Sequence, residues 1–273
     1  MTPEELDAAR LMLVGGAGEE PAEDLLYANW YHKSDAGPRR YPAGGAYLAA
    51  ILDPGRFEAG WQVAQTGLPG QAGCVEVHRN GERRAVAPPL VVPEAQDALV
   101  FEPGASVCVF PLGAAESGGF WHVTSPAWEM QEAPEHRQRL YFGLAPGSEP
   151  AFARAFVDCA DLKAAWSMKC LVGASSAGRC DGAVAYLPAE LGLDTGWVAD
   201  LIAAAAPLVA GASPPGTRVI AEGIAWAPDP ETDRSFGQVI CAALADVRVD
   251  PSDAEAWTVA ARSALAPLLK ATP

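Results

Sequence analysis

Apolar residues recur at helical spacing near the N-terminus and then alternate with polar residues, which separates predicted helices from predicted strands. Residues 2–5 form a capping box with a proline in the first turn, ahead of spaced leucines. Further helices are predicted at 23–32 and 47–52. An Asn-Gly pair at 80–81 is typical of a hairpin turn. The strand segments expected in this half are 60–67, 74–88, 98–103, 105–112 and 119–125.

The second half mixes strands with longer helices. A helix is expected to begin at Ser148 with Pro150 in its first turn, and Ser252 and Asp253 are expected to cap the last helix, which continues to Lys270. Strands mixed with segregated helices predict an α+β fold, a largely antiparallel twisted sheet flanked by helices. The remaining predicted strands are 139–144, 166–172, 182–187 and 217–227, and the remaining helices are 195–210 and 235–247.

Composition narrows the classes of protein that this chain can be. With 273 residues, half of them hydrophobic, it can fill a sizeable core. The formal net charge of −15 argues against a broad nucleic-acid surface and against binding to anionic membranes. We therefore expect partners other than nucleic acid or membrane, and any cluster of basic residues carries more information than usual.

Location and redox state follow from other features of the sequence. The N-terminal segment carries acidic residues where a signal peptide needs basic ones, and no apolar stretch is long enough to cross a bilayer. We therefore expect a cytoplasmic protein. The six cysteines show no C-x-x-C spacing, which favours reduced thiols over disulfides or a metal site.

Lys169 lies in the middle of the apolar strand 166–172, in a chain with only four lysines. One interpretation places it on the solvent face of a half-covered strand, because side chains alternate along a strand. The other is functional. The glycine spacing of the following loop, 173–180, is that of a phosphate-binding P-loop, but Arg179 and Cys180 stand where Lys and Ser or Thr are required, so we set that motif aside.

The functional interpretation of Lys169 depends on its neighbours. Arg179 lies near the end of the loop 173–180 and Asp181 follows the loop. The flanking strands can bring further cationic and phenolic side chains to the same face. Arginine forks bind phosphate monoesters well, and a lysine flanked by cations loses proton affinity and can act as a base near neutral pH. The flanking side chains are Arg139, Tyr141 and Tyr186.

The motifs RLYFGL, WSMKC and R-x-DGAVAYL, in this order, resemble the core of the HopA family of plant-pathogen type III effectors. They resemble more closely the HopA-like proteins encoded beside a kinase-like partner in class V lanthipeptide gene clusters. The resemblance extends to the segments LLYANWYHK, GRFEAGWQV, AEGIAWAPDP and RSFGQ. HopA-like proteins are in turn distantly similar to the bacterial phosphothreonine lyase effectors.

The resemblance implies roles by motif position. Lys169 would be the base that removes the α-proton of a phosphorylated residue, Arg179 would bind the phosphate, and Tyr186 would contact the substrate. Tyr141 stands where those lyases have the histidine that protonates the leaving group, so the acid is either Tyr141 or His122, which lies in another strand of similar pattern. Further candidates are Arg139, Arg218 and Arg234 as phosphate ligands and Asp181 as an orienting carboxylate.

The aromatic helix near the N-terminus leaves two interpretations open. Tyr27, Trp30 and Tyr31 follow the i, i+3, i+4 spacing that is more often core than ligand site. His32 and Lys33 could meet substrate at the end of this helix, although cations at helix ends usually only complement the dipole.

The resemblance implies a reaction, a partner and a division of the chain. The reaction is β-elimination of phosphate from phosphorylated Ser or Thr in a precursor peptide, without metal or organic cofactor. The partner is a kinase-like subunit in a heterodimer. Residues 1–92, a helical and hairpin region, would dock this partner or the leader of the precursor peptide, and residues 93–273 would be the lyase-like core of one continuous globular unit. The alternative is a non-catalytic peptide-binding or kinase-activating subunit, because the lyase histidine is missing.

Overall fold

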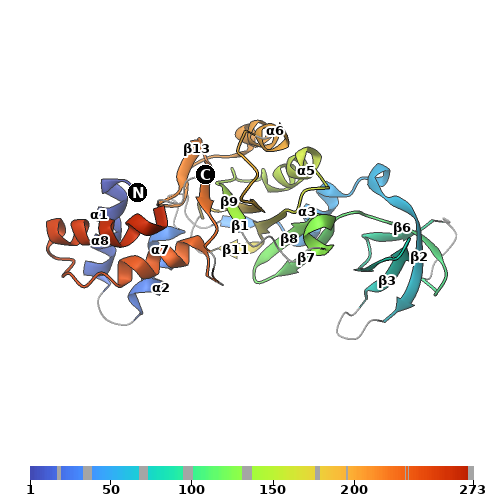
Figure 1. Ribbon diagram of the computed structural model, residues 1–273, viewed down its shortest axis with the longest axis horizontal. Helices are drawn as coiled ribbons and strands as arrows, with labels where there is room; N and C mark the ends of the chain where they lie inside the picture. Colours follow the sequence, from blue (N-terminus) through green and yellow to red (C-terminus); the bar gives the residue numbers. More distant parts are fainter. Residues whose placement is uncertain are drawn as a thin grey trace.

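The computed structural model is elongated, with a helical cluster at one end, a large sheet in the middle and a smaller sheet at the other end (Figure 1). The N-terminus lies at the helical cluster (Figure 1). The structure describes residues 1–16, 20–32, 39–67, 73–94, 101–130, 137–175, 179–194, 196–230, 232 and 234–269.

The central sheet is antiparallel throughout, with the strand order β13-β14-β9-β12-β10-β8-β7. This arrangement confirms the predicted α+β class. Its strands are β7 (Gly113–Ser117), β8 (Phe120–Thr124), β9 (Arg137–Phe142), β10 (Ser167–Leu171), β12 (Ala183–Pro188), β13 (Arg218–Ala221) and β14 (Ile224–Pro228).

The smaller sheet has the order β4-β3-β2-β6-β5. The Asn-Gly hairpin predicted here is present, since Asn80 has a φ of 52° and Gly81 a φ of 86° between β3 and β4. A separate two-stranded ladder pairs β1 with β11. The strands of these sheets are β1 (Arg39–Tyr41), β2 (Glu58–Thr66), β3 (Val75–Arg79), β4 (Glu82–Val86), β5 (Val91–Pro93), β6 (Ser106–Val109) and β11 (Gly173–Ser175).

The helices fall into two groups on opposite faces of the central sheet. One face packs on α3 (Gly44–Ile51), α5 (Glu149–Cys159) and α6 (Gly196–Ala205), around Leu140, Met168 and Trp226. The other packs on the helical cluster, through Tyr141 and Val184. The cluster consists of α1 (Pro3–Gly15), α2 (Ala22–Leu26), the π-helical turn η1 (Tyr27–Tyr31), α7 (Phe236–Ala245) and α8 (Ala254–Leu269). The shorter elements are α4 (Pro126–Met130), η2 (Pro54–Arg56) and η3 (Ala206–Leu208).

Local sequence signals explain several element ends. Thr2 and Glu5 form the predicted capping box of α1. Asp253 accepts a hydrogen bond from the amide of Ala256 at the start of α8. Ser148 precedes α5 as expected, but its hydroxyl donates to the carbonyls of Ala145 and Leu208, so it ties two loops together instead of capping the helix.

Other expectations differ from the structure. The strand expected at 217–227 is the hairpin β13–β14, because Gly223 turns the chain at a φ of 68°. Strand β7 was not expected. The boundary expected after Val92 falls inside β5, which pairs with β6 beyond it. A strand was expected at 98–103, but residues 101–103 do not form one, and residues 98–100 lie outside the described residues. Lys33, Thr195 and Lys270 also lie outside the described residues.

Candidate functional site

A pocket of about 190 Å³ opens on the face of the central sheet that the helical cluster covers in part. Sites for drug-sized ligands occupy roughly 300–1,000 Å³, so this pocket suits one side chain with a small charged group better than a large cofactor. Its lining residues are Tyr27, Tyr31, His32, Phe120, Arg139, Tyr141, Lys169, Arg179, Asp181, Val184 and Ser235.

Strand register brings the predicted residues to this one face. Lys169 is directly opposite Val184, which is in turn opposite Tyr141 on the next strand. Tyr186 is opposite Arg139. Since paired residues of neighbouring strands share a face, these side chains all point to the same side of the sheet. The grouping of a lysine, guanidinium groups and phenols expected from the sequence is therefore present.

Lys169 has no carboxylate partner within the described part of the chain. Its Nζ lies 4.4 Å from the ring centre of Phe120 and 5.5 Å from that of Tyr186, so cation–π contacts hold it. The side chain is partly buried in the pocket wall, not on an open solvent face. A lysine held by aromatic rings and unpaired with an acid is free to meet an anionic substrate.

Arg179, Asp181 and His32 form a compact charged group beside Lys169. Arg179 donates two hydrogen bonds of 2.8 Å to Asp181, one to each carboxylate oxygen. His32 Nδ1 lies 3.1 Å from Asp181 Oδ2. Burial alone would raise the pKa of Asp181, but His32 and Arg179 outweigh it and hold that pKa well below its usual range. Asp181 is therefore a permanent carboxylate at neutral pH.

Arg139 occupies the other side of the pocket and is nearly buried. It pairs with Asp229, which also binds Arg137 at 2.7 Å, and its guanidinium lies 4.9 Å from the ring centre of Tyr186. Burial alone would lower the pKa of Arg139, but Tyr141, Tyr186 and Asp229 hold it above its ordinary value. The paired Arg139 is thus a fixed positive charge at the edge of the pocket.

Three tyrosines close the pocket with neutral hydroxyls. Burial raises the pKa of Tyr27, Tyr31 and Tyr141 above 10. The hydroxyl of Tyr27 lies 3.1 Å from that of Ser235. The cations of this pocket therefore sit among neutral hydrogen-bonding groups, an arrangement suited to a tetrahedral oxyanion.

Four predicted residues do not line the pocket. Tyr186 is the first, although its ring centre lies 5.5 Å from Lys169 Nζ. His122 is opposite Lys169 on β8 and shares its face, but it lines a second pocket. Arg218 is opposite Trp226 and lines a third pocket near the N-terminus. Arg234 is exposed and paired with Glu23, although its neighbour Ser235 reaches the first pocket. The structure thus does not bring Arg218 and Arg234 together with Lys169.

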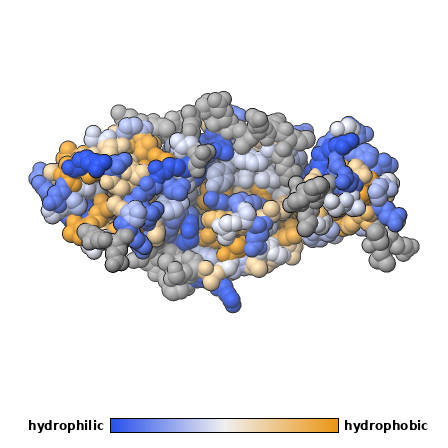
Figure 2. Space-filling view, turned by 90° about the horizontal axis from the view of Figure 1, so that it is seen from below, coloured by the Kyte–Doolittle hydropathy of each residue, from blue (hydrophilic) through white to orange (hydrophobic). Residues whose placement is uncertain are grey.

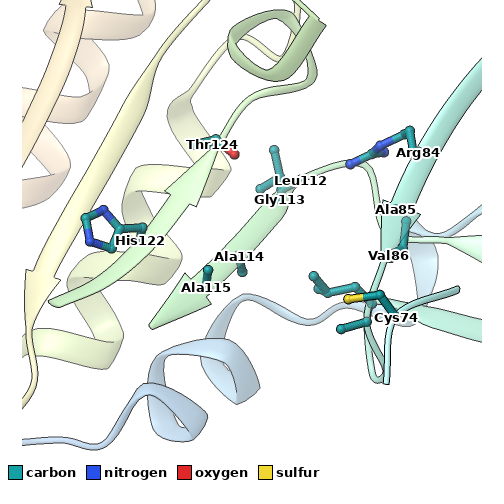
Figure 3. A pocket seen from close by; sticks show the side chains of 12 residues that line it. Cys74, Arg84, Ala85, Val86, Leu112, Gly113, Ala114, Ala115, His122 and Thr124 are labelled. Atoms are coloured by element: carbon teal, nitrogen blue, oxygen red, sulfur yellow. The ribbon is translucent and has the colours of Figure 1, made fainter. Parts of the chain in front are cut away.

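The second pocket, of about 200 Å³, lies between the two sheets (Figure 3). His122 and Thr124 stand on β8, and Arg84 and Cys74 approach from the smaller sheet (Figure 3). Burial lowers the pKa of His122, and the nearby charge of Lys169 lowers it further, outweighing a backbone hydrogen bond that raises it. His122 is thus a neutral neighbour of Lys169 that faces mainly a different cavity.

Sequence reasoning left open a substrate contact for His32, which lines the pocket, but gave no pocket role to Phe120 or Ser235. The aromatic spacing of Tyr27 and Tyr31 suggested core, and both rings do pack with the helical cluster. A π-helical turn ends at Tyr31, so that His32 turns into the pocket. The only signal for these residues in the sequence was the quoted motif LLYANWYHK.

The sequence matches the HopA1 effector protein family over residues 116–266. This match spans more than half of the chain and includes Lys169, Arg139 and Arg179. The protein therefore belongs to the HopA1 effector protein family. The match begins after the aromatic segment that supplies His32. A search among curated proteins finds no significant match.

Solved structures show a similar fold. The effector protein from Pseudomonas syringae pv. syringae strain 61 is 13% identical, with a TM-score of 0.53. The effector protein from Pseudomonas syringae pv. tomato strain DC3000 is 12% identical, with a TM-score of 0.54. Each alignment covers 97% of this chain and 92% of the other chain. At this identity the similarity shows the fold alone. Among the described residues, no helix has the length and hydropathy needed to cross a bilayer.

Proposed function

We propose that this protein removes phosphate from phosphorylated Ser or Thr residues of a peptide by β-elimination. One observation supports this most strongly: Lys169, without a carboxylate partner among the described residues, shares a small pocket with Arg139 and Arg179. In a protein with a net charge of −15, such a local excess of cations favours a multiply charged anion. The pocket size fits a phosphorylated side chain.

Arg179 is the main phosphate ligand in this proposal. Its contacts to Asp181 use Nε and Nη2, and a guanidinium carries five N–H donors. Nη2 also lies 3.0 Å from His32 Nδ1, so Nη1 is the group with capacity for phosphate oxygens. Asp181 fixes the plane of the fork, so that little side-chain entropy is lost when phosphate binds.

Lys169, in its uncharged form, would take the α-proton of the phosphorylated residue. The Cα–H electron pair forms the Cα=Cβ double bond, and the Cβ–O bond breaks with its electrons on the phosphate. The products are dehydroalanine from Ser or dehydrobutyrine from Thr, and free phosphate. Because the α-proton of a peptide is a poor acid, the adjacent amide needs a donor, and the phenol of Tyr186, within reach of Lys169, supplies one.

The setting we propose is lanthipeptide maturation, in which a kinase-like subunit phosphorylates the precursor peptide and this protein acts next. The support is the order of motifs from LLYANWYHK to RSFGQ, which resembles HopA-like proteins of class V lanthipeptide clusters. A protein of this kind works in the cytoplasm on a ribosomally made peptide. It needs neither metal nor organic cofactor for the chemistry.

The test is mass spectrometry of precursor peptide incubated with the kinase-like protein, with and without this protein. The kinase reaction alone should leave phosphopeptide, and the complete mixture should convert it to a species lighter by one phosphoric acid. Persistence of phosphopeptide in the presence of folded protein would contradict the lyase assignment.

A second function is favoured by one observation, the buried phenol of Tyr141 at the position of the lyase histidine. The protein would then bind the phosphopeptide, or activate the kinase, without chemistry. Tight phosphopeptide binding without loss of phosphoric acid, or faster phosphorylation in the same assay, would identify this role.

A further inference from the structure

The elimination needs an acid, because the oxygen that leaves Cβ carries the charge of a strongly basic phosphate. Neither residue expected to supply the proton is well placed. Tyr141 is buried, and burial raises the pKa of its phenol, so this group gives up a proton poorly. His122 lines the pocket between the sheets, and its pKa is lowered, so it holds little proton at neutral pH.

His32 lines the phosphate pocket itself and is only 7% exposed. Its ring stands edge-on to Tyr27, with centres 4.2 Å apart, and to Tyr31, with centres 5.4 Å apart. Two aromatic neighbours at interplanar angles of 77° and 85° restrict rotation of the imidazole. The ring is therefore held in one orientation before substrate binds.

The hydrogen-bond pattern assigns the protons of this ring. Asp181 is a carboxylate and can only accept, so His32 Nδ1, 3.1 Å from Asp181 Oδ2, carries a proton. Arg179 Nη2 donates to the same oxygen at 2.8 Å. The 3.0 Å between Arg179 Nη2 and His32 Nδ1 is thus the approach of two donors to one acceptor. Nε2 lies 3.4 Å from the same Nη2 and has no carboxylate contact among the described residues, so it is the ring atom that can release a proton.

Backbone contacts tie His32 to the loop that carries its partners. The amide of Cys180 donates to the carbonyl of His32 at 3.2 Å, and the Cys180 thiol donates to the carbonyl of Tyr31 at 3.3 Å. Cys180 lies between Arg179 and Asp181 in the chain. These two hydrogen bonds therefore fix the end of the aromatic helix against Cys180, although Tyr31 and Cys180 are 149 positions apart in the sequence.

We propose that His32 is the general acid of the reaction and that Asp181 is its positioning residue. This inference rests on the proposed lyase function. Nε2–H of the imidazolium protonates the bridging oxygen as the Cβ–O bond breaks, and phosphate leaves as hydrogenphosphate. Lys169 ends as an ammonium and His32 as a neutral imidazole, and exchange of one proton with water at each residue restores both. No oxidant, reductant or water molecule is consumed.

The experiment compares two peptide substrates whose leaving groups differ in how much they need protonation by a general acid. A peptide with phosphoserine releases a strongly basic oxyanion, whereas the same peptide with O-sulfoserine presents a tetrahedral group of similar shape and releases sulfate, a far weaker base. Wild-type protein, His32→Gln and Lys169→Met are assayed on both peptides by mass spectrometry, with unfolding curves for each variant.

For His32→Gln we expect a loss of roughly 100-fold or more on the phosphopeptide and a change of only a few-fold on the sulfopeptide. Lys169→Met should lose both activities, because both need removal of the α-proton. Asp181→Asn should show the same selectivity on top of a loss shared by both peptides, since Asp181 orients the imidazole and also holds the Arg179 fork. Retained sulfopeptide elimination shows that the variant is folded and binds substrate.

Equal losses of His32→Gln on both peptides would mean that His32 only supports the pocket, and full activity on both would mean that the acid lies elsewhere. Either result overturns the inference. If the wild-type protein does not eliminate sulfate, a chemical rescue experiment replaces the sulfopeptide comparison. Added imidazole should then restore phosphopeptide elimination by the His32→Ala variant, and failure to restore it overturns the inference. Inactivity of wild type on the phosphopeptide itself would instead refute the lyase function.

Discussion

The ring of Tyr31 lies directly over the α-carbon of Gly237, so that a β-carbon at position 237 would overlap the ring. Gly237 belongs to the first turn of α7, and Tyr31 forms a wall of the pocket that contains Lys169. The missing side chain of Gly237 thus allows Tyr31 to take its position in the pocket wall.

Gly237→Ala should therefore destabilise the protein by about 1–3 kcal/mol, the usual cost of overpacking, and should weaken phosphopeptide binding by displacing Tyr31. Urea unfolding and a binding titration measure the two effects. Gly45→Ala is the matched control, since nothing lies within 4 Å of a β-carbon there and the residue is in α3. It should leave stability unchanged or slightly raised. Equal behaviour of the two variants would contradict this packing argument.

Lys169→Met should keep the aliphatic stem but remove the proton acceptor. Phosphopeptide should accumulate in the coupled assay, with elimination reduced roughly 100-fold or more while the fold persists. Lys163→Met, at an exposed position before β10, is the matched control and should retain activity. Near-wild-type elimination by folded Lys169→Met would rule out Lys169 as the base.

Arg179→Lys should keep one positive charge but lose the planar fork that spans Asp181 and phosphate. Binding of phosphopeptide should weaken roughly tenfold or more, while binding of the unmodified peptide changes little. Isothermal titration with the two peptides measures the difference. Arg83→Lys, at a 73% exposed side chain, is the control. The same loss for both peptides would show that Arg179 supports the loop instead.

Asp181 should also contribute to acid sensitivity. Its pKa in the folded protein lies below its unfolded value of about 3.9, so the folded state favours the carboxylate. The stabilisation is complete above about pH 5 and is lost as the pH falls through about pH 4 toward the folded pKa. Asp181→Asn should lower the free energy of unfolding at pH 7 and flatten its fall between about pH 5 and about pH 2. Parallel pH curves for variant and wild type would contradict this.

The stable pair with a kinase-like subunit is a further prediction. Exposed apolar side chains on α1, Leu11 at 54% and Val14 at 46%, lie at the helical end, where Figure 2 shows apolar residues at the surface among polar ones. Co-expression followed by light scattering should give the mass of a heterodimer, and Leu11→Glu with Val14→Glu should weaken it. Leu162→Glu, away from this helix, is the control. Separate elution at micromolar concentration, even with precursor present, would refute the stable pair.

The sequence alone determined most of the elements and one half of the pocket. Capping residues, the Asn-Gly turn and period-two alternation are local signals, so the helix from Thr2 and the hairpin at Asn80 could be predicted. Strand alternation also placed Lys169 and the residues of its neighbouring strands on one face, because side-chain direction within a strand depends only on position.

Only the tertiary structure decided what lies across from that face. His32 stands at the end of a π-helical turn, and its approach to Asp181 depends on how the helical cluster packs on β9 and β12. Arg218 was predicted to join the same site, but the hairpin that turns at Gly223 places it at another pocket. Such long-range contacts arise from the burial of apolar surface. Because this driving force is non-directional, no local pattern in the sequence determines which distant residues come into contact.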